Sequence, residues 1–196
     1  MEVCNIDPFM HIIDLTDVPF SGDRCLTSFM TSSYISQQAV FLGELTNVDS
    51  KDQWLFPQLR ITCSTTITRV RFVGEHTGDG NKIPELQIWR RDSPTSSRYS
   101  RIHRTEGGAV ISTERSNMYA TFVSWQVQAG DVFGVYQPDL KKSKYNFAMQ
   151  EGGGELSYML ENERRAPKTF DTSNYDSDGH PYPLVNLDAS ESALSQ

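Results

Sequence analysis

The feature of this sequence that most constrains its fold is an alternation of apolar and polar residues with a period of two. In residues 66–73, Val70 and Phe72 point to one side of an extended chain and Arg69 and Arg71 point to the other. This pattern is typical of a strand with one face in a core and one face in water. Residues 118–127 repeat the alternation with β-forming residues on both sides, which predicts a strand covered on both faces.

Similar stretches recur at nearly regular spacing along the chain. Strands are expected at residues 39–45, 54–62, 85–89, 99–103, 131–137, 145–150, 156–160 and 182–185. The segments between them are rich in Gly, Pro, Asp and Asn, which suit turns, and no amphipathic helix of four turns is evident. The sequence therefore predicts an all-β fold, an antiparallel β-sandwich of jelly-roll-like architecture.

The domain organisation follows from the same pattern. The sandwich is expected to occupy residues 38–188, with residues 1–37 as an extended N-terminal arm packed on it and residues 189–196 as a flexible tail. The chain has 196 residues, and it contains no apolar run near the roughly 20 residues that span a membrane. The formal net charge of -7 argues against duplex nucleic acid as the main partner.

The three cysteines, Cys4, Cys25 and Cys63, form no CxxC motif and no cluster with histidine at zinc spacing. One disulfide and one free thiol is a natural arrangement for part of a secreted protein, and Cys25 with Cys63 is the preferred pair. The alternative is three reduced, buried cysteines in a cytosolic protein.

Several pieces of the chain carry a family resemblance when they are taken in order. They are WLFPQLRITC at residues 54–63, ITRVRF at 67–72, PELQIWR at 84–90, VQAGDVFGVYQP at 127–138 and PLV at 183–185. Together they resemble a module repeated in large extracellular proteins of sponges and other simple animals. The resemblance implies a secreted β-sandwich beside adhesion and receptor-type domains, with no assigned catalytic residues. The sequence departs from the module at Cys63, which does not begin a glycosylation acceptor, so no sugar is expected there.

Charge is distributed unevenly along the chain. Residues 60–104 carry 9 basic and 4 acidic side chains, whereas residues 1–59 carry 2 and 8 and residues 151–196 carry 3 and 9. The basic stretch is mostly arginine, which suits bidentate contacts with carboxylate, sulfate or phosphate groups. The candidate interaction residues are therefore Arg69, Arg71, Arg90, Arg91, Arg98, Arg101 and Arg104. An acidic partner would fit them, and a second copy of the chain is the simplest one. The alternative is a solvated face with internal salt bridges to Glu75, Glu85 and Asp92.

Trp89 is a further candidate for an interaction surface. If Leu86 and Ile88 face the core, Gln87 and Trp89 face away from it, and an exposed tryptophan suits a sugar ring or a protein hot spot. The alternative is a Trp89 side chain covered by another loop.

Other constellations point to chemistry less directly. The acidic stretch at residues 171–180 offers oxygen ligands for calcium without the spacing of an EF-hand. Glu151 and Glu155 resemble an acid and base pair, but four scattered histidines and the lack of a Gly-x-Ser-x-Gly elbow give hydrolysis little support. No cofactor is expected beyond this.

Together, these observations predict a secreted, non-enzymatic structural or interaction protein. It would mediate protein assembly in cell adhesion or in an extracellular or skeletal, biomineral matrix, through self-association, other proteins, a glycan or a mineral surface. A lectin-like carbohydrate-binding module is the alternative, and a hydrolase is a third hypothesis.

Overall fold

The computed structural model describes Cys25 and residues 46–76, 80–106, 112–115, 118–150, 157–174 and 182–190. Within these ranges the regular elements are β-strands and two 3₁₀ turns, which confirms the predicted all-β class. The strands are β1 (Thr46–Asn47), β2 (Gln53–Arg60), β3 (Thr65–His76), β4 (Glu85–Arg91), β5 (Arg98–Arg104), β6 (Ser112–Arg115), β7 (Met118–Val127), β8 (Val132–Tyr136), β9 (Tyr145–Gln150), β10 (Tyr158–Leu160), β11 (Thr169–Asp171), β12 (Tyr182–Pro183) and β13 (Val185–Ser190), with 3₁₀ turns η4 (Leu140–Lys142) and η5 (Thr172–Asn174).

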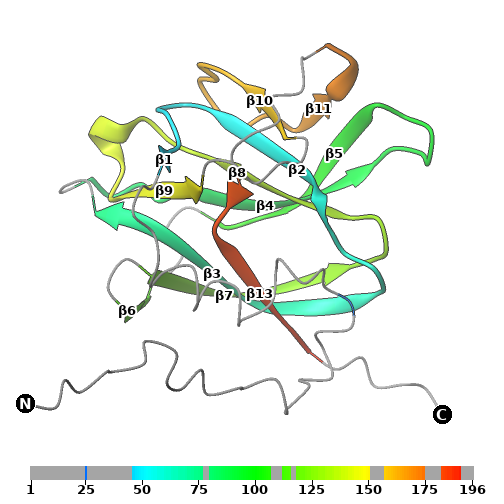
Figure 1. Ribbon diagram of the computed structural model, residues 1–196, viewed down its shortest axis with the longest axis horizontal. Coiled ribbons are helices and arrows are strands. Elements are labelled where there is room, and N and C mark those ends of the chain that lie inside the picture. The colour runs from blue at the N-terminus through cyan, green and yellow to red at the C-terminus, as the bar shows by residue number, and fades with distance from the viewer. Residues whose placement is uncertain are drawn as a thin grey trace, which may run out of the picture.

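The strands form two antiparallel sheets, as the sandwich prediction requires. One sheet has the order β10-β2-β8-β4-β5-β11. The other has the order β1-β9-β3-β7-β6, with β12 added on β9 and β13 added on β3. In Figure 1, β3, β7 and β13 lie side by side below β2, β4 and β8. The main core lies between the two sheets.

The alternation in β3 orders that core as expected. Val70 and Phe72 are fully buried, and Phe72 stacks on Phe147 with ring centroids 5.8 Å apart. Strand β7 is covered on both faces only in its first half: Ala120 is buried, whereas Phe122 is 74% exposed. The prediction of two covered faces is therefore wrong for the second half of β7.

A smaller second core lies on the outer face of the six-stranded sheet. It consists of Leu55, Trp89, Tyr99, Val132, Leu160 and Phe170. Strands β10 and β11 supply Leu160 and Phe170, because β10 pairs with β2 and β11 pairs with β5. This arrangement explains why all five residues of β8, VFGVY, are buried: each face of the strand has its own core.

A disulfide joins Cys25 to Cys63, with a Cα–Cα distance of 4.8 Å, and confirms the predicted pair. The expected N-terminal arm lies outside the described residues except for Cys25, and so do the strand expected at residues 39–45 and the end of the expected tail. Strand β13 continues to Ser190, two residues past the expected boundary at residue 188. None of the helices in the described ranges has the length and apolarity needed to cross a membrane.

Candidate anion-binding cleft

A cleft of about 580 Å³ opens where the second core ends. It lies on the same face of the six-stranded sheet, beside β4 and β5. The segment at residues 161–168, which connects β10 to β11, forms the opposite wall, and the loop before β4 closes one end. The lining residues are Asn81, Lys82, Ile83, Glu85, Arg101, Arg104, Thr105, Glu106, Tyr136, Pro138, Arg164, Arg165, Ala166 and Lys168.

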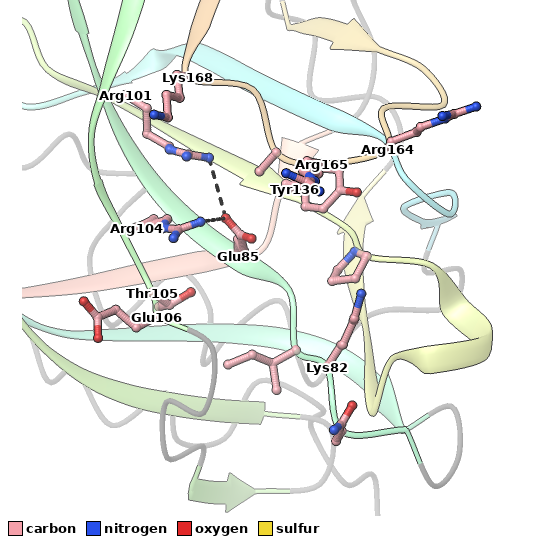
Figure 2. Close-up of a pocket in the computed structure, with 14 residues that line it drawn as sticks. Lys82, Glu85, Arg101, Arg104, Thr105, Glu106, Tyr136, Arg164, Arg165 and Lys168 are labelled. Carbon is pink, nitrogen blue, oxygen red and sulfur yellow. Dashed lines mark hydrogen bonds and ion pairs between the residues drawn. The ribbon is translucent and has the colours of Figure 1, made fainter.

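Cationic side chains dominate this lining. Six of the lining residues are basic and two, Glu85 and Glu106, are acidic. Figure 2 shows the guanidinium groups of Arg101 and Arg104 directed at Glu85, whereas Arg164 points away from it. Charges of one sign in a hollow with low-dielectric walls concentrate the field there, so the cleft attracts anions.

A β-bulge brings Arg101 and Arg104 to the same face of β5. Residues three apart in a regular strand point to opposite faces. In β5, however, Ile88 pairs with His103 and Trp89 pairs with Arg101, which leaves Ile102 as an extra residue. Ile102 packs against the main core, while Arg101 and Arg104 both reach the outer face and Glu85.

The Glu85 carboxylate satisfies these two guanidinium groups only weakly. Its Oε2 lies 3.6 Å from Nη1 of Arg101 and 3.5 Å from Nη1 of Arg104. Strong charge-assisted hydrogen bonds are shorter, about 2.7–2.9 Å. The Arg101 side chain is only 10% exposed, and its Nη1 has no hydrogen-bond partner in the described part of the chain. A buried donor without a partner costs about 1–3 kcal/mol, so an acceptor placed beside Arg101 Nη1 would stabilise this part of the cleft.

The burial of Arg101 and Tyr136 in the cleft shifts the pKa values of both side chains. Burial lowers the pKa of the Arg101 guanidinium, while the charge of Glu85 opposes that shift and Arg104 adds to it. Burial also raises the pKa of the Tyr136 hydroxyl, with a smaller contribution from the Glu85 charge. The environment therefore disfavours the bare cation at Arg101, and an anion placed beside it would stabilise that cation.

Hydrogen bonds to backbone groups hold the two walls of the cleft in place. The Tyr136 hydroxyl donates to the carbonyl of Glu163 at 2.9 Å, and the amide of Glu163 donates to the carbonyl of Lys51 at 2.8 Å. The amide of Arg101 donates to the carbonyl of Lys168 at 2.9 Å. At the other end, the amide of Lys82 donates to the carbonyl of Lys142 at 3.0 Å. The cations are therefore presented from fixed backbone positions, which lowers the entropy cost of binding.

The structure brings only two of the predicted arginines into the cleft. Arg69 and Arg71 do face outward from β3, but both bind Asp188 on the neighbouring strand β13, at 2.5 and 2.6 Å. Arg71 also donates to Oδ1 of Asn186 at 2.8 Å. The prediction of an outward row is correct, and this row is neutralised in part by its own sheet.

The other predicted arginines also have partners within the chain. Arg90 forms two hydrogen bonds, at 2.7 and 2.8 Å, with the fully buried carboxylate of Asp131. Arg91 lies over the Tyr99 ring and donates to its hydroxyl. Arg98 lies 3.6 Å from Asp92. The alternative of internal salt bridges to Glu85 and Asp92 therefore holds for Arg98, Arg101 and Arg104, whereas the other four predicted arginines have different partners.

The expectation that Trp89 is exposed and available to a sugar ring or a partner protein is wrong. Its side chain is on the outer face of the sheet, as the alternation predicts, but it is fully buried. Phe170 of β11 packs edge-on against it, and its Nε1 donates to Oε1 of Gln87 at 2.9 Å. The covering segment at residues 157–174 has too few apolar residues to be recognised in advance as the second layer of a core.

The remaining candidates are only partly described. Among the described residues no group of three or more His, Cys, Asp or Glu side chains is placed to hold a metal ion. Asp171 binds Ser97 and Ser173 through Oδ1, while residues 175–180 of the calcium candidate lie outside the description. Glu151 and Glu155 also lie outside it.

The four other cations of the cleft, Lys82, Arg164, Arg165 and Lys168, were absent from the predicted set. One sequence signal is visible in retrospect: Arg164, Arg165 and Lys168 are the only basic residues of an acidic C-terminal segment. Comparison of the chain with family models, curated proteins and solved structures gives no match.

Proposed function

We propose that this protein is a non-enzymatic interaction protein of the extracellular space, which binds a partner carrying acidic groups through the cationic cleft. The observation that carries the proposal is the convergence of Arg101 and Arg104 on one weakly bonded carboxylate, Glu85, within a cleft lined by six basic residues. Guanidinium groups bind carboxylates and sulfates bidentately and keep their protons near neutral pH, so they suit binding.

The extracellular location rests on the disulfide between Cys25 and Cys63. Disulfides persist in oxidising compartments and are rare in the cytosol. Cell adhesion or an organised extracellular matrix is the setting that we propose, because partners with many acidic groups are abundant there. A second copy of this acidic chain remains one candidate partner, and sedimentation at low and high ionic strength tests it.

Glu85 has a defined part in this proposal. Its carboxylate occupies the position that an acidic group of the partner would take between the two guanidinium groups. Replacing it by glutamine removes a competing negative charge and keeps the shape of the side chain. We therefore expect the Glu85→Gln variant to bind anions more tightly than the natural protein does.

Isothermal titration with citrate at low ionic strength tests the proposal, because citrate places three carboxylates within a small volume. The double variant Arg101→Gln/Arg104→Gln should lose about tenfold or more in affinity. Arg98→Gln is the control for each of the two single variants, Arg101→Gln and Arg104→Gln: it removes one positive charge from the same strand, outside the cleft. Equal losses in the double variant and in the control would refute the cleft as the binding site.

A further inference from the structure

A second hollow lies beside the cationic cleft. It measures about 520 Å³ and lies between β5 of one sheet and β7 of the other. Arg104, Thr105 and Glu106 line both hollows, so the two lie next to each other across these three consecutive residues. The amide of Thr105 donates to the carbonyl of Leu86 at 2.9 Å, which fixes this junction to β4.

The second hollow differs from the first in its chemistry. Its lining includes Phe122, Trp125 and His103. The rings of His103 and Trp125 stack nearly parallel, with centroids 5.9 Å apart, and His103 Nε2 lies 2.8 Å from the carbonyl oxygen of Gln126. Phe122 is the one large hydrophobic side chain that stands exposed in the described part of the chain. Aromatic side chains therefore line the second hollow, and Arg69 lies over the Phe122 ring with its guanidinium carbon 5.9 Å from the ring centroid.

We propose that the two hollows form one groove, and that this groove binds a linear acidic polysaccharide. This inference rests on the function proposed above and names the class of its ligand. Sulfate or carboxylate groups of the glycan would bind Arg101, Arg104 and the neighbouring cations. A sugar ring further along the chain would lay its apolar C–H face on Phe122.

The two chemistries follow from the composition of such a glycan. Each ring carries both an apolar face and, at intervals, a fully ionised group. The cleft offers the cations for the ionised groups, and Phe122 offers a rigid apolar surface at low entropy cost. Each hollow also has an exposed neutral polar side chain that could form hydrogen bonds with sugar hydroxyls. These are Asn81 in the first hollow and Ser124 in the second.

Glu106 opposes this binding at the junction. Its side chain is exposed and lines both hollows. An exposed carboxylate is well solvated and screened by salt, so it reduces affinity without blocking the groove. The Glu106→Gln variant should bind the glycan more tightly, by about twofold to fivefold.

The experiment uses fluorescently labelled heparin oligosaccharides of two lengths, four and twelve sugars, with neutral dextran and poly-glutamate as comparison probes. We expect Phe122→Ala to weaken the longer oligosaccharide about fivefold and to leave the shorter one unchanged, because the shorter one fills only the cationic cleft. Phe122→Tyr should restore the affinity. Arg104→Gln, at a half-exposed position that tolerates substitution, should weaken both oligosaccharides about tenfold, and Arg98→Gln should weaken neither.

Three results would overturn the inference, and they differ in what they say about the proposed function. If Arg104→Gln weakens binding and Phe122→Ala does not, the cleft binds anions but the second hollow makes no contact with the glycan. If poly-glutamate binds as tightly as the longer oligosaccharide and loses as much on Phe122→Ala, the partner is an acidic protein. If Arg104→Gln and Arg98→Gln behave alike, both proposals fail.

Discussion

The indole nitrogen of Trp89 lies 2.6 Å from the point that a β-carbon on Gly134 would occupy. Gly134 is opposite Gln87 in the pairing of β8 with β4, so the indole of Trp89 lies diagonally across it. The absent side chain makes room for the largest residue of the second core, which the cleft adjoins.

Gly134→Ala should therefore overpack the second core and lower the free energy of unfolding by about 1–3 kcal/mol. Urea denaturation, followed by circular dichroism, measures the change. Adding Trp89→Phe should recover part of the loss, since the smaller ring vacates the space around the new methyl group. The carbonyl oxygen of Trp54 lies 2.8 Å from the same point, so a Gly134→Ala variant as stable as the natural protein would show that the indole and this carbonyl can both move at no cost.

The pair formed by Arg90 and Asp131 is expected to contribute more to stability than the exposed pairs. The Asp131 side chain is fully buried, and its Oδ2 also accepts from the amide of Gln128 at 2.8 Å. Arg90→Gln leaves this carboxylate buried without its cation and should cost about 3 kcal/mol. Arg98→Gln breaks an exposed pair and should cost less than about 1 kcal/mol. Denaturation midpoints of the two variants test the difference, and similar midpoints would contradict it.

Asp52 should make stability fall as the pH rises. Burial raises the pKa of this carboxyl above its ordinary value of 3.8, and a hydrogen bond from the amide of Asn162 only partly opposes the shift. A raised pKa in the folded state gives a contribution that is complete below pH 3.8 and is lost as the pH rises through the folded-state value. Asp52→Asn should remove this loss, so its stability relative to the natural protein should increase over that pH window. An NMR titration that places the pKa of Asp52 below 3.8 would reverse the sign.

The disulfide should leave one free thiol among the three cysteines of the denatured, unreduced protein. Because Cys25 and Cys63 are separated by 38 positions, closing this loop should stabilise the fold by about 4 kcal/mol. Cys25→Ser/Cys63→Ser should lower the unfolding free energy by a comparable amount. Thiol counting in guanidinium measures the first expectation, and three reactive thiols would refute it.

The sequence could predict those parts of the fold that depend on period-two alternation. Val70 and Phe72 are buried and Arg69 and Arg71 point outward because register follows side-chain alternation within one strand. Strand β11 was not predicted, since its three residues, TFD, are too few to show a period. The fate of Trp89 depended on that strand, which covers it.

The cleft was predictable only in its residue types. The arginine-rich stretch indicated anion binding, and two of its members, Arg101 and Arg104, line the cleft. Their spacing of three would place them on opposite faces, and only the bulge at Ile102 brings them together. No residue in this stretch marks the bulge, because it arises from pairing with β4. Arg164 and Arg165 reach the cleft through tertiary contacts that local patterns do not encode.

The burial of Trp89 beneath β11 also gives the protein an intrinsic optical probe. The same segment that covers the indole, residues 157–174, carries Arg164, Arg165 and Lys168 into the cleft. If that segment detached from the sheet, the indole would be exposed to water. The arrangement of Arg164, Arg165 and Lys168 around the cleft would be lost in the same step. In a Trp54→Phe/Trp125→Phe variant, which keeps Trp89 as its one tryptophan, a red shift in emission should therefore report loss of the binding cleft before the rest of the sandwich unfolds.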